Sequence, residues 1–384
     1  MIAAARGWRA AALVCALSGA TAAAEPLLDF SRDEIARIAA HGPWPPQPVA
    51  DASNRVEGRR VAVALGRELF FDPRLSADGR LACASCHRPA QAFQDGRAVA
   101  QGRASGLRNT PSLLNASQQR WYGWDGAHDS LWAASLAPLL SANEMGHDGA
   151  GLARVVRAQR NWRQRWPQAF GRALPSDDEQ LAVDVAKLLA TYQATLVSRR
   201  TPFDDFRDAL LRGDRKAAAR YPLDAQRGLR LFVGEARCHV CHAGPAFSNG
   251  EFADIGIPFF AAGGVDPGRH GGLQKLLASP MNRLGTFNDA GAAADPRAVT
   301  TRHVVQLHRH FGEFRVPGLR ELPATAPYMH DGSLATIEDV VRHYSELDEE
   351  RLHADGERIL RKLNLSAEQS ADLAAFLRTL RGLR

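Results

Sequence analysis

Two short stretches of the sequence carry the same arrangement of cysteine and histidine. CASCH spans residues 83–87 and CHVCH spans residues 238–242, so each pair of cysteines is followed at once by a histidine. This motif is typical of c-type haem, which bonds covalently to both thiols while the histidine ligates the iron. We therefore predict two covalently bound haems c. The predicted haem-binding residues are Cys83, Cys86, His87, Cys238, Cys241 and His242.

Zinc binding and disulfide formation are the alternative fates of these four cysteines. A zinc site would need both cysteine pairs to fold together, and it would leave both trailing histidines unexplained. Two disulfides are the ordinary expectation for an exported chain with four cysteines, but they also leave the histidines unexplained. The repeated histidine therefore favours haem.

Helical patterns must position these motifs. Ser176 and Glu179 form a capping box that predicts a helix through residues 181–197, and Ser366 with Gln369 predicts the start of the last helix. That last helix is expected to bury Leu373, Phe376, Leu377 and Leu380 and to stop at Gly382. No alternating strand pattern of useful length occurs. The sequence predicts a mainly α protein with two tandem cytochrome-c-like domains, each holding one haem.

The chain divides into four predicted segments. Residues 1–24 form a signal peptide, and residues 25–57 form a lead-in that contains the proline-rich stretch HGPWPPQP. The helical pattern breaks at residues 198–202, where we place the boundary between the two domains. The N-terminal domain is expected at 58–200, with the peroxide-reactive haem, and the C-terminal domain at 201–384.

The first residues resemble an export signal. Arg6 and Arg9 precede an apolar run that is too short to span a bilayer, and the small residues 22–24 give a cleavage site. Val14 precedes Cys15 where a lipoprotein signal would place glycine or alanine. We therefore expect a periplasmic protein without a membrane anchor.

The charge of the chain does not predict a nucleic-acid partner. Loss of residues 1–24 removes two arginines and no acid, so the formal net charge falls from +6 to +4. Haem propionates would bring this charge near zero, and no block rich in lysine and arginine occurs.

Further motifs occur in a fixed order around the two haem motifs. They are FFDPRLS (70–76), LRNTPSLLN (107–115), WDG (124–126), NEM (143–145), VPGLREL (316–322) and APYMHDGSL (326–334). In this order they resemble the bacterial di-haem cytochrome c peroxidase and MauG superfamily over nearly the whole chain beyond residue 57. The similarity is closest to the MauG-like branch of MbnH type.

This resemblance implies that the second haem has a tyrosine ligand. Peroxidases of the family carry a methionine fourteen residues after His330, a position that Tyr344 occupies here, as in MauG-like enzymes. Independently, Thr336 can cap a helix in which Tyr344 shares one face with Ile337, Val340 and Val341. His343 lies off that face, and Met329 is a weaker candidate within a turn. The alternative is that Tyr344 is an ordinary core tyrosine.

For the first haem the resemblance implies an open site with an acid nearby. Some relatives close this site with a histidine where Gln101 stands here. Glu144 matches the distal acid that would move a proton on bound peroxide, and Pro138 matches a distal-pocket position. Ala134 replaces a distal glutamine of relatives. Without the resemblance, Glu144 would be taken for an ordinary surface residue.

Two features are implied between the haems. Trp124 matches a tryptophan that relays electrons between them, although a buried core aromatic would look the same in sequence. Asn109, Thr325 and Pro327 match a calcium site built from oxygen donors.

Three functions remain open at this point. The leading hypothesis is an oxidase that uses H2O2 to form a high-valent di-haem state and oxidises a protein partner, at tryptophan if it follows MauG-like enzymes. The second is a detoxifying peroxidase fed by a small cytochrome, and the third is a non-catalytic electron-transfer cytochrome. All tryptophans lie at or before Trp166, so an electron route through the second domain is expected to use tyrosine or a direct jump.

Overall fold

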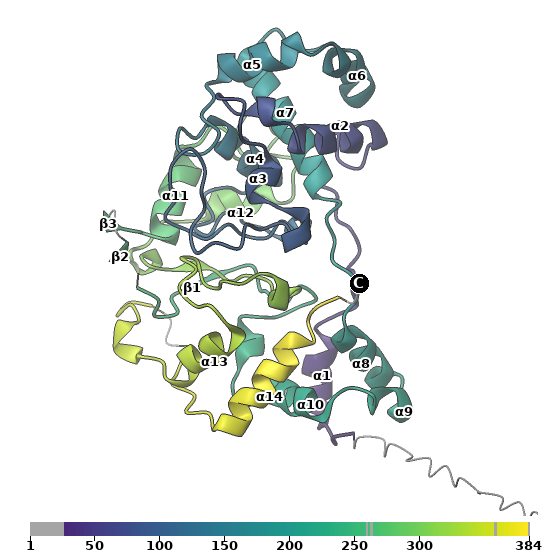
Figure 1. Ribbon diagram of the computed structural model, residues 1–384, viewed down its shortest axis with the longest axis vertical. Helices are drawn as coiled ribbons and strands as arrows, with labels where there is room; N and C mark the ends of the chain where they lie inside the picture. Colours follow the sequence, from purple (N-terminus) through teal and green to yellow (C-terminus); the bar gives the residue numbers. More distant parts are fainter. Residues whose placement is uncertain (1–26, 259, 262–263, 357–358, 383–384) are drawn as a thin grey trace, which may run out of the picture.

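The computed structural model describes residues 27–382 except 259, 262–263 and 357–358 (Figure 1). The predicted signal peptide lies outside these residues. The described chain forms two mainly helical lobes, stacked along the long axis of the molecule, as Figure 1 shows. Within the described residues, no helix is both long and apolar enough to cross a membrane.

The upper lobe is organised around one buried helix. Its core helix α7 packs against α2, α4 and α5, and every residue of α7 from Leu181 to Gln193 is buried. Gly66 allows α2 to cross α7 closely, because a Cβ there would meet the carbonyl oxygen of Leu188 at 1.9 Å. The helices of this lobe are α2 (Arg60–Phe70), α3 (Cys83–Cys86), α4 (Leu131–Leu140), α5 (Gly149–Ala158), α6 (Arg160–Phe170) and α7 (Asp178–Gln193).

The lower lobe contains a similar close crossing of two helices at a glycine. Helix α10 precedes the second cysteine motif and packs along α14, and a Cβ on Gly228 would meet the carbonyl oxygen of Asp372 at 1.9 Å. In both lobes a glycine on the helix before the cysteine motif therefore permits close packing on a later helix. The helices here are α8 (Pro202–Leu211), α9 (Arg215–Ala218), α10 (Leu223–Val233), α13 (Ile337–Ser345) and α14 (Ala367–Arg378).

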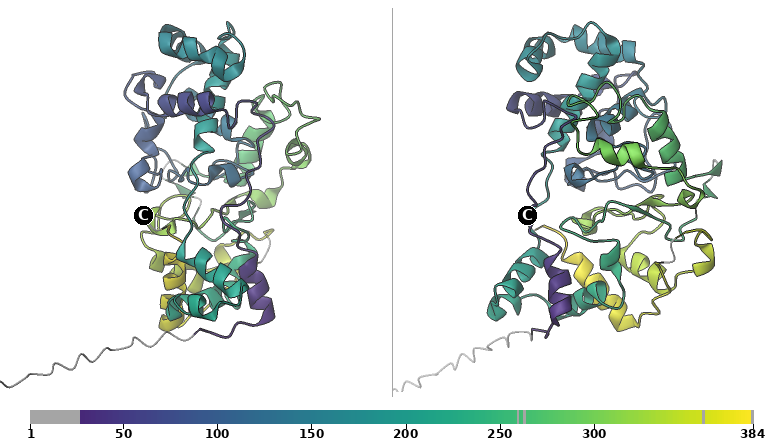
Figure 2. Two further views of the ribbon diagram at one scale, coloured as in Figure 1. Left: turned by 90° about the vertical axis from the view of Figure 1, so that its right-hand side faces the viewer. Right: turned by 180° about the vertical axis from the view of Figure 1, so that it is seen from behind.

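The chain crosses between the lobes more than once. Helix α1 (Arg32–Ala39), at the start of the lead-in, packs against α8 and α10 of the lower lobe. Helices α11 (Arg269–Ala278) and α12 (Ala298–His303) lie beside the upper lobe in both views of Figure 2. The Lys187 ammonium donates to the carbonyl of Phe287 at 2.7 Å. This hydrogen bond connects the segment between α11 and α12 to helix α7 of the upper lobe. The domain boundary at residue 200 stays a prediction.

Strands contribute little to the described fold. β1 (Phe252–Ala253) pairs with β4 (Phe314–Arg315), and β2 (Phe260–Ala261) pairs with β3 (Gly264–Val265), both antiparallel. All four strands are two residues long, in agreement with the mainly helical prediction.

The observed N-caps of α14 and α7 can be compared with the two capping boxes that the sequence predicted. Ser366 and Gln369 form the predicted capping box of α14, and all four apolar residues expected on its inner face are buried, although the helix ends at Arg378. The prediction of Ser176 as a cap was wrong. Asp177 caps α7 by accepting from the backbone of Gln180, and the helix ends at Gln193. Aspartate is an equally good cap and stands one residue nearer the helix.

Candidate haem sites

The first cysteine–histidine motif holds its histidine in one orientation. Both cysteines lie on α3, and the backbone N–H of His87 donates to the carbonyl of Cys83 at 2.9 Å. The imidazole Nδ1 of His87 lies 3.0 Å from the carbonyl oxygen of Phe93. Because a carbonyl only accepts, Nδ1 carries the proton and Nε2 keeps its lone pair for a metal.

The second motif repeats this geometry. It begins with the 3-10 turn η4 (Cys238–Val240), and Nδ1 of His242 lies 3.0 Å from the carbonyl oxygen of Phe247. Phe247, like Phe93, has a positive φ, which turns its carbonyl back toward the imidazole. Burial lowers the pKa of both His87 and His242, which favours the neutral, metal-binding form.

The cysteines fit haem attachment better than the alternatives. None of the four cysteines forms a disulfide. Burial raises the pKa of the Cys83 and Cys238 thiols to about 12. Among the described residues, no group of ligands close enough to share one metal ion includes a cysteine. The two pairs therefore do not assemble the single zinc site that the sequence left open.

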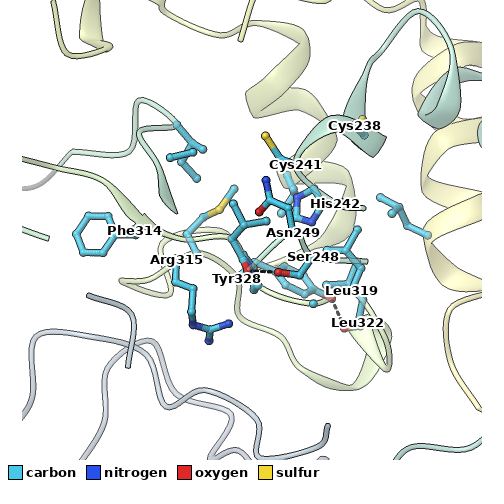
Figure 3. Close-up of a pocket in the computed structure, with 18 of the residues that line it drawn as sticks. Cys238, Cys241, His242, Ser248, Asn249, Phe314, Arg315, Leu319, Leu322 and Tyr328 are labelled. Carbon is cyan, nitrogen blue, oxygen red and sulfur yellow. Dashed lines mark hydrogen bonds between the residues drawn. The ribbon is translucent and has the colours of Figure 1, made fainter. Parts of the chain in front are cut away.

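A cavity of about 670 Å³ lies beside the second motif. Cys238, Cys241 and His242 line one part of it (Figure 3), and the rest is lined by apolar residues of the lower lobe together with polar residues and a segment of the first half of the chain. The volume lies within the usual range of about 300–1,000 Å³ for cofactor sites. Two thiols, a free imidazole nitrogen and apolar walls fit a covalently bound haem. The apolar lining includes Leu319, Leu322, Ile337, Val340, Val341, Leu373 and Leu377.

Tyr344 also lines this cavity. Thr336 and Asp339 form the predicted capping box of α13, and the predicted face of this helix, Ile337, Val340, Val341 and Tyr344, borders the cavity. His343 points elsewhere, since its Nε2 lies 2.8 Å from the carbonyl oxygen of Ile255. Burial, with a smaller contribution from the two cysteines, raises the pKa of Tyr344, so its phenol is neutral without a neighbouring cation. Met329 lines the same cavity, and its backbone has a φ of 72°.

Glu144 lies close to the first motif. Burial and then charged neighbours, Glu144 among them, raise the pKa of the thiols of Cys83 and Cys86. Glu144 is exposed, but partial loss of water raises the pKa of its carboxyl group, and a hydrogen bond with Ser141 opposes only part of that change. Pro138, within α4, accepts from the backbone of Met145 at 3.1 Å and so anchors the loop that carries Glu144.

The loop around Gln101 packs against the Glu144 segment. A Cβ on Gly102 would lie 2.5 Å from the carbonyl oxygen of Asn143, and the backbone of Arg103 donates to the carbonyl of Glu144 at 3.2 Å. The amide of Gln101 donates to Ser105 at 2.8 Å within the same loop. Ala134 is half-buried on α4 and brings no polar group to replace the distal glutamine of relatives.

Trp124 belongs to the first half of the chain but lines the cavity beside the second motif. Its Nε1 donates to the carbonyl of Asn109 at 2.9 Å, and its own carbonyl accepts from the backbone of Arg315 at 2.8 Å. The guanidinium of Arg315 lies 5.9 Å from the centre of the Trp124 ring. Burial lowers the pKa of Arg315 to about 10.

A family model described as di-haem cytochrome c peroxidase matches residues 60–215. The methylamine utilization protein MauG of Methylorubrum extorquens is 33% identical over 95% of this chain and 90% of its own length. A cytochrome-c peroxidase of Denitromonas iodatirespirans is 35% identical over 88% of this chain and 85% of its own. The chain belongs to the di-haem cytochrome c peroxidase and MauG family. It is therefore a di-haem peroxidase-type enzyme that acts on H2O2, with two haems c.

Solved structures agree with this assignment. A MauG-like protein associated with microbial copper homeostasis is 29% identical and superposes with a TM-score of 0.65 over 88% of this chain and 95% of its own. The diheme peroxidase BthA of Burkholderia thailandensis, at 21% identity, shares the fold with a TM-score of 0.66 over 87% of this chain and 89% of its own.

The three residues matched to the family's calcium site lie in the lining of the cavity. Asn109, Thr325 and Pro327 all line it. The side-chain amide of Asn109 donates to the carbonyl of Arg97 at 2.7 Å, which turns its N–H group away and leaves its side-chain oxygen as an acceptor. Calcium binding by this di-haem peroxidase stays a prediction.

The sequence analysis did not predict a cluster of three charged residues that lie far apart in the sequence. Arg108, directly before Asn109, makes paired hydrogen bonds of 2.7 Å to Asp266 and an ion pair of 2.8 Å with Asp125. Burial alone would raise the pKa of Asp125 and of Asp266, but Arg108 holds both below the ordinary value. The only sequence signal was a charged residue within the LRNTP motif.

The lead-in brings a tryptophan to the second half. Trp44 is buried, its Nε1 donates to the carbonyl of Ser198 at 3.0 Å, and the guanidinium of Arg320 lies 3.8 Å from its ring centre. A tryptophan from early in the chain thus lies against Arg320 of the later half, while the electron route through tyrosine or a direct jump stays a prediction.

Proposed function

We propose that this di-haem enzyme uses H2O2 to oxidise a protein partner, with tryptophan as the oxidised side chain. Tyr344 carries the proposal, because its phenol borders the same cavity as His242. An anionic oxygen ligand stabilises ferric and more oxidised iron, whereas a thioether favours ferrous iron. A tyrosinate at this position suits a site that holds an oxidising equivalent better than one that accepts electrons from a cytochrome.

The protein residues would divide the work as follows. Each histidine, His87 and His242, offers Nε2 to one iron, and the four cysteines offer their sulfurs to the two macrocycles. Bound haem would supply the redox chemistry that couples reduction of H2O2 to oxidation of the partner. The carboxylate of Glu144 would take a proton from one oxygen of H2O2 and return it to the leaving oxygen. Two electrons from the partner and two protons convert H2O2 to two waters. One water then adds to the oxidised indole, which supplies the added oxygen atom and releases two protons.

Trp124 would carry electrons between the two sites. Trp124 belongs to the first half of the chain and borders the cavity beside the second motif, which supports a position between the two sites. Gln101 offers no imidazole to close the first site, so peroxide can enter without prior reduction. Both roles rest on the similarity to the family together with the positions of these side chains.

We also propose export to the periplasm and one bound Ca2+. Residues 1–24 would direct export, and the partner would be a periplasmic protein or a small redox protein. The side-chain oxygen of Asn109 with backbone oxygens at Thr325 and Pro327 would hold the ion. N-terminal sequencing of the mature protein and metal analysis after dialysis test these two points.

A specific observation supports a second candidate function. Met329 lines the same cavity as Tyr344, and a methionine ligand would suit a peroxidase fed by a small reduced cytochrome. The similarity to a cytochrome-c peroxidase at 35% identity fits that function as well. A non-catalytic electron carrier is not proposed, because the family is one of peroxidases.

Peroxide-driven oxidation of a periplasmic extract separates the two enzyme functions. Oxidised holoprotein with H2O2 is expected to add oxygen to tryptophan in one extract protein, detected by peptide mass spectrometry, whereas Glu144→Gln is expected to leave it unmodified. Rapid turnover with a reduced small cytochrome c, without protein modification, would favour the second candidate.

A further inference from the structure

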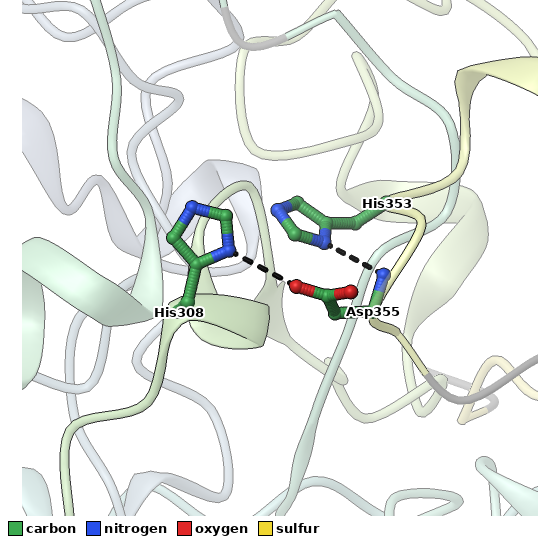
Figure 4. Close-up of side chains that lie close together, drawn as sticks. All are labelled: His308, His353 and Asp355. Atoms are coloured by element: carbon green, nitrogen blue, oxygen red, sulfur yellow. Dashed lines mark hydrogen bonds and ion pairs between the residues drawn. The ribbon is translucent and has the colours of Figure 1, made fainter.

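Three potential metal ligands meet on the surface of the protein. His308, His353 and Asp355 each place one donor atom within 4.8 Å of the other two (Figure 4), and none of the three lines the haem cavity. No other such group of His, Cys, Asp or Glu occurs in the part of the chain that the structure describes. We propose that these residues bind a divalent transition-metal ion of the Zn2+ or Cu2+ type.

The three side chains come from two segments that are far apart in sequence. His308 begins the turn η5 (His308–His310), whereas His353 and Asp355 follow the turn η7 (Glu349–Arg351). Nδ1 of His308 lies 3.2 Å from a carboxylate oxygen of Asp355, and the two imidazole rings are 5.0 Å apart. Figure 4 shows that the second ring nitrogen of His353 faces His308. An ion between them would link the two segments.

The backbone already holds one side of this site. The N–H of His353 donates to the carboxylate of Asp254 at 2.7 Å. Nδ1 of His353 accepts from the N–H of Asp355 at 3.2 Å, so metal binding through Nε2 requires the ring proton to move to Nδ1 and this contact to open. Donors around zinc at about 2.0–2.1 Å lie about 3.4 Å apart. The donor atoms here lie within 4.8 Å of one another, so they need to approach by up to about 1.4 Å. His308 and Asp355 have side chains that are 78% and 66% exposed, which leaves them free to make that movement.

The donor set selects the class of ion. Two imidazoles with one carboxylate suit Zn2+, Cu2+ and similar ions, whereas Ca2+ and Mg2+ prefer sites built only from oxygen. Three protein ligands leave a fourth position open to water. A simple surface ion pair between His308 and Asp355 would contribute little and would give His353 no role.

Titration calorimetry with zinc chloride on the mature di-haem protein tests the proposal. One Zn2+ is expected per chain, and His308→Ala or His353→Ala should weaken its binding. Loss of a partner that only supports a metal ligand already costs about 10–100-fold, so loss of a ligand should cost at least about 100-fold. His303→Ala is the matched control, because His303 is an exposed histidine at the end of α12 and should leave binding unchanged.

Asp355→Asn and a copper titration complete the test. Asp355→Asn keeps the side-chain shape but removes its charge, so it should weaken Zn2+ binding, and Cu2+ should bind the parent protein more tightly than Zn2+. Haem absorbance verifies that each variant is loaded. Absence of saturable binding of both ions would overturn the proposal, as would an equal loss of affinity in His303→Ala.

Discussion

The two haem motifs have the same local geometry but face different surroundings. In both, Nδ1 of the histidine lies 3.0 Å from a phenylalanine carbonyl, so the ligand nitrogen is oriented in the same way. The first motif has the partly exposed acid Glu144 nearby, whereas the second faces a cavity with apolar walls, Tyr344 and Met329. The orientation of each histidine is thus set by the five-residue motif and a phenylalanine a few residues after it, and the chemistry of each site by side chains from distant segments.

Removal of one pair of thiols has the largest expected effect on this comparison. In Cys238→Ala/Cys241→Ala the second haem should be lost, and the empty cavity should destabilise the lower lobe, while the first haem stays attached. Denaturing mass spectrometry is expected to show one haem per chain, and Cys83→Ala/Cys86→Ala is the mirror-image control. Two covalent haems in either variant would refute the assignment of the motifs.

Glu144→Gln removes the acid that distinguishes the first site from the second. We expect both haems to be retained and the reaction with H2O2 to slow by about 100–10,000-fold, since a positioned acid–base group is lost. In the parent protein the rate should fall as the pH drops through the raised pKa of Glu144, because the carboxylate is then protonated. Stopped-flow mixing measures both effects.

Glu179→Gln provides the control for that experiment. Glu179 is an exposed acid in the first turn of α7 and should leave the rate unchanged. If Glu144→Gln reacts as fast as this control, Glu144 is not the acid–base group.

The ion cluster between the halves should have a smaller effect, on stability. The pKa of Asp266 in the folded protein is below its ordinary value, so the cluster stabilises the fold above the unfolded-state pKa and loses this effect as the pH falls through the lowered value. Asp266→Asn should cost about 1–3 kcal/mol at neutral pH and flatten the acid limb of the stability curve. Asp205→Asn, which alters an exposed pair with Arg200, should cost less than about 1 kcal/mol.

Urea unfolding at several pH values measures the free energy of unfolding of Asp266→Asn, Asp205→Asn and the parent protein. Equal losses of unfolding free energy in Asp266→Asn and Asp205→Asn would show that the interactions of Asp266 with Arg108 stabilise the fold no more than an exposed ion pair does.

The sequence predicted the features that depend on neighbouring residues. Capping pairs such as Thr336 with Asp339 form within one helical turn, and they placed α13 and therefore the face that carries Tyr344. Features that depend on distant segments were missed. The contact of Arg315 with Trp124, the folding of Trp44 onto the second half and the packing of α11 and α12 on the first all need a tertiary structure before they exist. One local error, the choice of Ser176 over Asp177, arose because two good caps are adjacent. The predicted ends of α7 and α14 were also wrong, because these helices end earlier, at Gln193 and Arg378.

The identity of the sixth ligand at the second haem is the central claim, and redox titration of Tyr344→Phe tests it most directly. Loss of an anionic ligand should raise the reduction potential of that haem by on the order of hundreds of millivolts and change its ferric EPR spectrum, because axial ligands set haem potentials. Met329→Leu, which changes the other candidate ligand in the same cavity, should leave both unchanged. An unaltered potential in Tyr344→Phe together with a shift in Met329→Leu would contradict the account and support the peroxidase fed by a cytochrome.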